Sequence, residues 1–145
     1  MKITIETLPE GAEEEIVIRS NSMDSELMEL IYAIKAGRSR LTAFNGEEII
    51  KLDSKAVYYF ESVDNKVYAC AEKNVYEIKQ KLYELEKIYE HTDFLRISKA
   101  MIVNVSKVMK IVPMFNGRLE ALLGNGEKVV ISRQYVPDLK KKLGI

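Results

Sequence analysis

The hydrophobic positions at the start of the chain follow a strand-like pattern. Ile3 and Ile5 alternate with polar neighbours, which predicts a half-buried strand over residues 2–7. A proline and a glycine interrupt this pattern, and a short apolar run then predicts a second strand over residues 15–20. Both strands need partners, because a two-stranded unit buries little surface.

A helix-like pattern follows the two strands. Leucines and isoleucines recur at helical spacing up to Gly37, and Ser22 or Asp24 can cap the first turn, so we expect a helix running to about Ala36. With the strands it makes a small ββα N-terminal unit over residues 1–39. A unit of this size cannot hold a core alone, and we expect it to pack on the rest of the chain or on a second copy.

From residue 40 onward, short apolar runs alternate with turn signals such as Asn-Gly, in which both residues tolerate positive φ. A helix is expected from Glu77 to about Tyr89 and a helical turn near the C-terminus, while residues 100–103 fit either a helical turn or a strand. The fold class is therefore α+β and mostly β, with packed antiparallel sheets over residues 40–145. The predicted strands cover 40–44, 47–52, 56–62, 66–72, 75–76, 94–98, 108–114, 118–123 and 127–132.

Composition agrees with a folded chain. The protein has 145 residues, of which 47% are hydrophobic and 30% are charged. No apolar run approaches the roughly 18 residues of a membrane span. A single cysteine, Cys70, cannot form an internal disulfide, which is typical of the reducing cytosol, so we expect a cytoplasmic protein.

The zero net charge conceals an asymmetry along the chain. Residues 1–45 carry 8 acidic and 5 basic side chains, whereas residues 91–145 carry 4 acidic and 10 basic ones. A basic C-terminal half can bind a polyanion through one face, because attraction to phosphates acts locally. Solvation of an ordinary surface explains the lysines equally well.

The motifs of common enzymes are missing from the sequence. It has no glycine-rich phosphate loop, no cysteine and histidine spacing typical of metal sites, and no nucleophile motif. Cys70 and His91 could form a thiol–imidazole pair, but nothing around Cys70 indicates exposure or a lowered pKa. We therefore expect no catalytic residue, no cofactor and no metal.

Four stretches of the C-terminal hundred residues resemble the LytTR family of bacterial DNA-binding domains. They are an apolar run that closes on a glutamate (56–62), the strand across the next turn (66–68), a signature with Phe-Leu-Arg-Ile before a polar pair and Val-Asn (94–104), and a closing strand with its Ser-Arg exit (130–135). Their order and spacing agree over residues 42–145, and together they are specific although no single stretch is.

This resemblance implies an elongated, multi-sheet domain that contacts DNA through loops instead of a recognition helix. Side chains from a hairpin loop and from the C-terminal exit would enter successive major grooves, and the centre would cross the minor groove between them. Members usually bind repeated duplex sites as pairs, so the resemblance implies a transcription regulator that forms a homodimer on double-stranded DNA.

The resemblance implies that two cations would enter the grooves. Arg133 follows the closing strand and can pair bidentately with guanine, although it could instead pair with Asp138 on the surface. Lys66 follows the Asp64-Asn65 turn at a position that contacts DNA in the family, and plain solvation is its alternative. Both residues are candidate DNA contacts.

The central signature supplies further candidates. Ser98 and Lys99 form its polar pair and suit contacts to the DNA backbone or minor groove. Arg96 lies on the polar side of its strand, where an intramolecular salt bridge is equally plausible. Lys107 is a generic phosphate candidate, whereas Asn104 is expected to bond the backbone.

The N-terminal unit has no part in the DNA contacts that the resemblance implies. We expect it to mediate dimerisation or to contact a regulator. The roughly 40 residues before the resemblance cannot hold a receiver domain of about 120 residues, so a membrane-embedded regulatory protein is the expected controlling partner. The alternative is a protein-interaction module without direct DNA readout.

Overall fold

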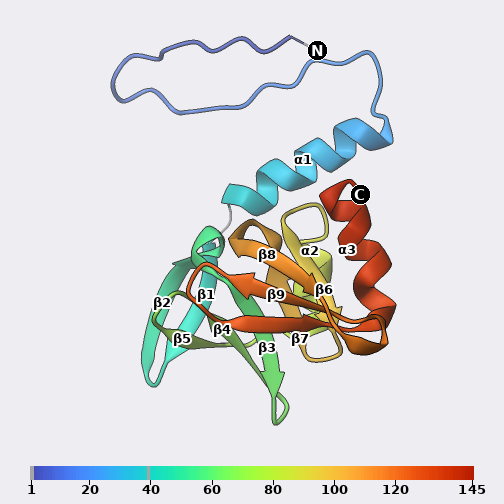
Figure 1. Ribbon diagram of the computed structural model, residues 1–145. Coiled ribbons are helices and arrows are strands. Elements are labelled where there is room, and N and C mark those ends of the chain that lie inside the picture. The colour runs from blue at the N-terminus through green and yellow to red at the C-terminus, as the bar shows by residue number, and fades with distance from the viewer. Residues whose placement is uncertain (1, 39) are drawn as a thin grey trace.

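The computed structural model describes residues 2–38 and 40–145 and is mostly β (Figure 1). Within these residues two antiparallel sheets of seven and three strands are accompanied by three helices. The helices are α1 Ser25–Arg38, α2 Leu82–Ile88 and α3 Val136–Leu143. The strands are β1 Arg40–Asn45, β2 Glu48–Asp53, β3 Tyr59–Val63, β4 Lys66–Cys70, β5 Val75–Ile78, β6 Phe94–Ser98, β7 Met101–Asn104, β8 Val108–Pro113, β9 Leu119–Leu123 and β10 Lys128–Ile131.

The seven-stranded sheet, in the order β2-β1-β5-β4-β3-β7-β6, contributes the larger core. Its apolar side chains pack against α2, whose Leu85 is fully buried. Phe60, Tyr89 and Phe94 form an aromatic cluster at its centre, with ring centroids 4.9 to 5.9 Å apart. These contacts fix the sheet and the β6–β7 end relative to each other.

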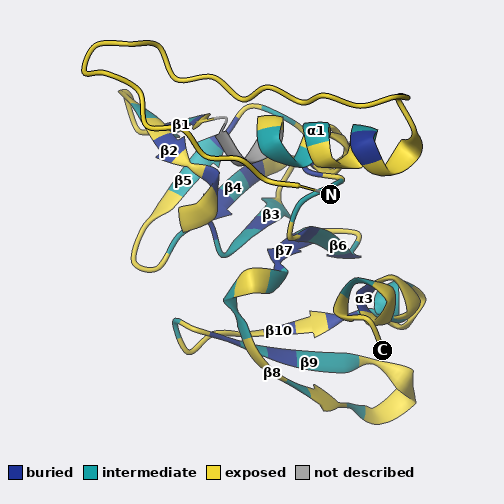
Figure 2. Cartoon of the chain, turned by 90° about the horizontal axis from the view of Figure 1, so that it is seen from above, coloured by how far each residue is buried: buried dark blue, intermediate teal, exposed yellow. Residues whose placement is uncertain are grey.

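The three-stranded sheet, in the order β10-β9-β8, forms the second core. Leu123 and Ile131 pack there with Ile97 of β6 and Leu139 of α3. Because Ile97 belongs to the larger sheet, β6 joins the two cores. The view in Figure 2 shows the smaller sheet as a separate layer with α3 along its side. The predicted meander of three strands is confirmed.

Asn104 holds the end of β7 to the start of β3. Its Nδ2 donates to the Val57 carbonyl at 2.9 Å, and its Oδ1 accepts from the Ser106 amide at 3.1 Å. The side chain is 3% exposed, so these bonds satisfy a buried amide. The predicted structural role of this residue is confirmed, and residues 100–103 prove to belong to a turn and strand rather than to a helix.

The prediction of two strands before the first helix is wrong for the single chain. Residues 2–20 form no strand, and all of them are exposed (Figure 2). Alternation alone does not make a strand without a neighbour to complete the hydrogen-bond ladder. The predicted helix is present as α1, and the Leu27 amide donates to Asp24 Oδ1 at 2.8 Å, so Asp24 provides the cap.

One further boundary, the start of the second helix, differs from the prediction, and the predicted domain boundary stays a prediction. The helix expected from Glu77 begins only at Leu82, because Ile78 is buried in β5 opposite Val67. The predicted division between 1–39 and 40–145 falls at Ser39, which lies outside the described residues, so this division stays a prediction. Across the described part of the chain, no helix is long and apolar enough to span a membrane.

Candidate nucleic-acid interface

Backbone hydrogen bonds bring the β3–β4 hairpin next to the β6–β7 turn. The Ser62 amide donates to the Ala100 carbonyl at 2.8 Å, so the end of β3 lies beside the residues that connect β6 to β7. The hairpin itself is closed by Asp64 and Asn65, with φ of 50° and 63°. Both values fit the tight hairpin turn that the sequence predicts, and the turn points away from α1 in Figure 1.

A second backbone bond brings the exit of β10 to the same place. The Ser132 amide donates to the Ile97 carbonyl at 2.9 Å, which ties the chain just before Arg133 to the end of β6. The Ile131–Leu119 pair closes the β9–β10 ladder at this end of the smaller sheet. The turn between β6 and β7 therefore lies between the hairpin on one side and the β10 exit on the other.

These segments form a continuous row that we call the loop edge. We define it as the β3–β4 turn, the β6–β7 turn, the β8–β9 loop and the β10 exit, with residue ranges 63–66, 98–101, 114–118 and 132–134. The β8–β9 loop joins the row through Gly117, which lies against the Arg133 side chain. Four of the six predicted DNA contacts lie on it, namely Lys66, Ser98, Lys99 and Arg133. Residues far apart in the sequence are thus aligned by main-chain bonds, which hold them independently of side-chain flexibility.

Lys66 is exposed at the hairpin end of the loop edge. Its side chain is 63% exposed, and its Nζ lies 4.0 Å from Glu77 on β5. Lys79 approaches the same carboxylate at 3.7 Å and lies over the Phe44 ring, 5.2 Å from the centroid. Ion pairs this exposed contribute little to stability, so both ammonium groups are available to an anion.

Arg133 is exposed at the other end of the loop edge, and its aliphatic stem packs over the β8–β9 loop. A Cβ placed on Gly117 would lie 3.1 Å from Arg133 Cδ and 3.3 Å from Cγ. Gly117 therefore provides the space in which this stem lies. Among the described residues no ion pair joins Arg133 to Asp138, the alternative that the sequence left open.

Arg96 is bound inside the chain. Its Nε donates to the Ser98 carbonyl at 2.6 Å, a terminal nitrogen donates to the Lys99 carbonyl, and another lies 3.3 Å from Glu86 on α2. With its side chain only 19% exposed, it shapes the β6–β7 turn from behind. Lys99 itself is exposed, and Ser98 Oγ accepts from the Ala100 amide at 3.3 Å. That Arg96 touches DNA stays a prediction.

Lys107 lies away from the loop edge. It precedes β8, whereas the β8–β9 loop follows that strand, so a strand length of roughly 20 Å separates them. Its Nζ lies over the Tyr58 ring, 5.1 Å from the centroid. The sequence interpretation missed Lys79 and Arg118, which lie on or beside the loop edge. The sequence signal that could have identified both residues is a cationic side chain directly after a predicted strand or turn.

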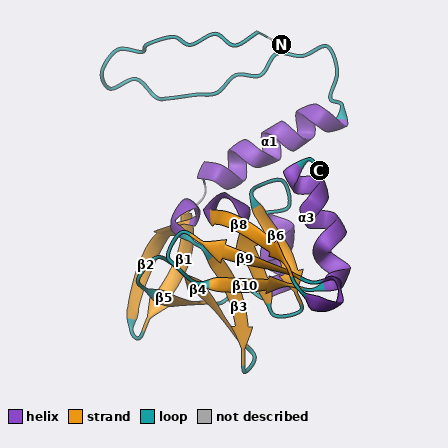
Figure 3. Ribbon diagram, in the orientation of Figure 1, coloured by secondary structure: helices purple, strands orange, loops and turns teal. Residues whose placement is uncertain are grey.

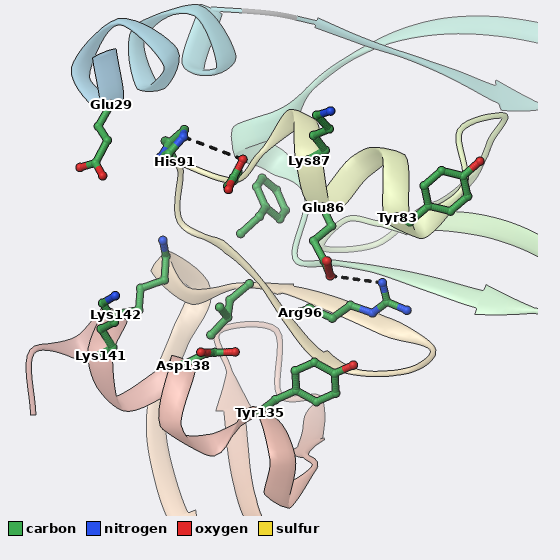
Figure 4. A pocket seen from close by; sticks show the side chains of 13 residues that line it. Glu29, Tyr83, Glu86, Lys87, His91, Arg96, Tyr135, Asp138, Lys141 and Lys142 are labelled. Atoms are coloured by element: carbon green, nitrogen blue, oxygen red, sulfur yellow. Dashed lines mark hydrogen bonds and ion pairs between the residues drawn. The ribbon is translucent and has the colours of Figure 1, made fainter. Parts of the chain in front are cut away.

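A wide cavity of about 830 Å³ opens between the three helices and β6 (Figure 4). Lysines from α2 and α3 and acidic side chains from all three helices line it, and the Arg96–Glu86 ion pair lies at one side. His91 stacks on Tyr32 of α1 with ring centroids 5.4 Å apart. The mixed charges do not favour a polyanion here, in contrast to the loop edge.

The only cysteine is unsuited to nucleophilic chemistry. Cys70 is 5% exposed, and burial raises the pKa of its thiol to about 11 despite an opposing hydrogen bond with Tyr59. Burial and hydrogen bonds with Glu127 and Cys70 raise the pKa of Tyr59 as well. At neutral pH the thiolate is scarce, so the predicted role of Cys70 as a small core side chain agrees with its environment.

Comparison with known proteins gives relatives of two kinds. The chain is 31% identical over 110 residues to the sensory transduction protein LytT of Bacillus subtilis, covering 76% of this chain and 46% of that protein. The corresponding protein of Enterococcus faecalis is 32% identical over 114 residues, with coverage of 78% and 47%. This chain thus spans about half the length of these relatives. An uncharacterised HTH-type transcriptional regulator of Staphylococcus aureus (strain MSSA476) is 28% identical over 148 residues and is covered from end to end, at 100% and 99%.

A solved structure shares the fold. A LytTr DNA-binding domain from Bacillus cereus superposes with a TM-score of 0.70 at 30% identity, covering 75% of this chain and 100% of that chain. Within the described residues, the three helices are separated by strands (Figure 3), so no two of them form a helix-turn-helix. The fold therefore presents loops, rather than a helix pair, at its strand ends.

The family model described as the LytTr DNA-binding domain matches residues 47–144. This range agrees with the one over which the four sequence stretches resemble that family, and the resemblance is confirmed. A family of DNA-binding domains also confirms that the chain is not an enzyme. The chain belongs to the LytTR family of bacterial DNA-binding domains.

Proposed function

We propose that the chain is a transcription regulator that binds duplex DNA sequence-specifically through its loop edge. The observation that carries this proposal is the pair of backbone hydrogen bonds, Ser62 to Ala100 and Ser132 to Ile97, that aligns the candidate segments in one row. Regulators of similar length in Staphylococcus aureus support the regulatory part. Phosphate attraction to this cationic row provides affinity, and base contacts provide specificity.

The row suggests a role for each candidate. Lys66 and Arg133 lie at its two ends, where their side chains enter successive major grooves, and Arg133 pairs with guanine O6 and N7. Ser98 and Lys99 lie between them and contact the backbone or the minor groove. Arg96 acts through the turn that it braces, because its donors are already bonded to carbonyls of that turn.

Partners beyond DNA follow from the same proposal. Two molecules occupy a repeated site in the cytoplasm, and pairing increases affinity because the second binding event becomes effectively intramolecular. A membrane-embedded regulatory protein is the proposed controlling partner. Its test is co-purification from solubilised membranes, where the absence of any integral-membrane protein counts against it.

Selection from random duplex DNA at two salt concentrations tests the function. We expect a repeated motif to be enriched and its affinity to fall steeply as salt rises, because bound counterions are released. Arg133→Ala should weaken binding to the selected site by about 1–3 kcal/mol and relax preference at one base pair. Lys128→Ala is the control, since Lys128 is exposed at the start of β10, at the opposite end of that strand from Arg133.

The outcome also decides between DNA binding and protein interaction. Lys66→Ala should weaken selected and unrelated DNA alike if it holds a phosphate, and only the selected site if it contacts a base. No enriched motif and no salt-sensitive binding would refute the proposal. The chain would then be a protein-interaction module, for which the exposed apolar residues of the N-terminal segment provide a surface.

A further inference from the structure

The N-terminal segment, residues 2–24, exposes apolar side chains that the rest of the described chain does not cover. Ile3 and Ile5 are 82% and 89% exposed, and Ile16 and Ile18 are 54% and 39% exposed. The segment doubles back, so that two arms, residues 2–6 and 15–19, run in opposite directions (Figure 1). Exposed isoleucines at regular spacing indicate a surface that is covered in an assembly.

The second arm carries the residue types of the first arm in reverse order. The first is Lys2-Ile3-Thr4-Ile5-Glu6 and the second is Glu15-Ile16-Val17-Ile18-Arg19. In each, two isoleucines flank a β-branched centre, and opposite charges stand at the two ends. In an extended conformation the isoleucines lie on one face, with the charges and the centre on the other.

Charge opposes pairing of the two arms within one chain. The Ala12 amide donates to the Pro9 carbonyl at 3.1 Å, and Gly11 has φ of 87°, so a turn at these residues sets the hairpin register. Continuing that register places Glu6 opposite Glu15, and Lys2 opposite Arg19. Like charges directly opposite each other destabilise an antiparallel pair. This agrees with the absence of strand pairing in residues 2–20 of the single chain.

Charge favours pairing of each arm with the same arm of a second copy. In an antiparallel pair centred on Val17, Glu15 of each chain stands opposite Arg19 of the other, and Ile16 opposite Ile18. A pair centred on Thr4 places Lys2 opposite Glu6 in the same way. One two-fold axis can pass through both centres, as an isologous contact between identical chains requires. The arms of one chain then face each other through their isoleucines.

We propose that the N-terminal segment is a dimerisation element in which each arm forms an antiparallel strand pair with the same arm of a second copy. The two ribbons stack through their isoleucines, which are exposed in the single chain, and the charged faces remain in solvent. Other described surfaces fit this face less well. The outer face of the three-stranded sheet alternates apolar residues with Lys110, Glu120 and Lys128. This inference goes beyond the proposed function and is tested without DNA.

Substitutions that reverse charges in the second arm test the pairing. The dissociation constant of the dimer is measured by sedimentation velocity of the full chain across a concentration series. Glu15→Arg places two arginine side chains opposite each other at both ends of the Val17-centred pair, and it should weaken dimerisation by about ten- to hundredfold. Arg19→Glu should do the same. The double variant, Glu15→Arg with Arg19→Glu, should recover part of the dimerisation: it restores both cross-chain pairs, but it also makes positions 15 and 19 opposite in charge to Glu6 and Lys2 of the same chain. Glu13→Arg makes the same charge change outside both arms and is the control.

Mixing the two single variants gives the sharpest result. In a heterodimer of the Glu15→Arg chain with the Arg19→Glu chain, both cross-strand pairs are opposite in charge. Two samples that are each monomeric should therefore form dimers when combined. Pairing within one chain predicts the reverse, because Glu15→Arg would remove a repulsion with Glu6.

Several results would overturn the proposal. A wild-type chain that stays monomeric at all concentrations would overturn it. This holds even if the arms are protected from hydrogen exchange, because such protection would then come from pairing within one chain. Unchanged dimerisation in both single variants, or no heterodimer on mixing, would also contradict it. Binding of a single DNA half-site is expected to be unaffected by these changes, so failure of the dimer and failure of the DNA-binding function are distinguished.

Discussion

The position of Gly117 predicts that a single added methyl group disturbs DNA recognition. Gly117 has φ of 74°, and the Cβ of an alanine there would lie 3.1 Å from Arg133 Cδ. This is closer than ordinary van der Waals contact, so the Arg133 stem must move away from the β8–β9 loop. Gly117→Ala should therefore weaken binding to the selected DNA by an amount that does not exceed the loss of Arg133 itself, about 1–3 kcal/mol.

The same substitution has a separate cost to stability. A residue with a side chain in the left-handed region loses roughly 1–2 kcal/mol relative to glycine. Gly126→Ala is the matched control, because Gly126 has φ of 88° and nothing lies within 4 Å of the added Cβ. Both variants should lose similar free energy of unfolding in urea, while only Gly117→Ala loses DNA affinity. The comparison thus isolates the contact with Arg133.

A double-mutant cycle measured by titration of labelled duplex completes the test. In the Arg133→Ala background, Gly117→Ala should change DNA affinity by no more than a few tenths of a kcal/mol, because the displaced side chain is already absent. The reasoning is refuted if the two losses add in full. It is also refuted if Gly126→Ala weakens DNA binding as much as Gly117→Ala does.

Three further changes have defined outcomes. Arg96→Ala should lower the free energy of unfolding by about 1–3 kcal/mol and weaken DNA binding, because carbonyls of the β6–β7 turn and Glu86 lose a charged donor. Chemical denaturation measures the first effect and DNA titration the second. An unchanged free energy of unfolding and an unchanged DNA affinity would contradict this prediction. Asn104→Ala should cost about 1–3 kcal/mol in the same denaturation assay, since the amide is buried and bonded; a smaller loss would argue against its role. The free energy of unfolding should fall above about pH 9, because folding raises the pKa of the Cys70 thiol to about 11. The stability that the neutral thiol contributes is complete below the pKa of the unfolded chain, and it is lost as the pH rises toward the pKa of the folded chain. Cys70→Ala should reduce the fall in the free energy of unfolding above about pH 9. If stability falls equally with pH in the wild-type protein and in this variant, Cys70 is not the group responsible.

The sequence predicted the β-rich part well because turn chemistry and core periodicity agree there. The positive φ values at Asn65, Asn116 and Gly117 are those that the turn residues predict. Alternation failed over residues 2–20, where the pattern is clear but no strand is present to pair with it. The predicted helix is present, but its predicted start at residue 77 was wrong, because helical spacing at Ile78 could not be distinguished from a strand position facing Val67.

The candidate site was predicted in its parts but not in its arrangement. Lys66, Ser98, Lys99 and Arg133 came from motif positions, and their alignment depends on backbone bonds between residues 62 and 100 and between 97 and 132. Such long-range contacts leave no local signal in a single sequence. For the same reason the spatial separation of Lys107 could not be predicted.

Mapping the contact surface on the full chain tests the central claim most directly. Backbone amide shifts would be recorded with and without the duplex obtained by selection. The account predicts that the largest changes fall on the four segments of the loop edge, residues 63–66, 98–101, 114–118 and 132–134, and that the β9–β10 turn at the opposite end of the smaller sheet is unaffected. Changes centred instead on the cavity between α1, α2 and α3, with the loop edge unaltered, would contradict it.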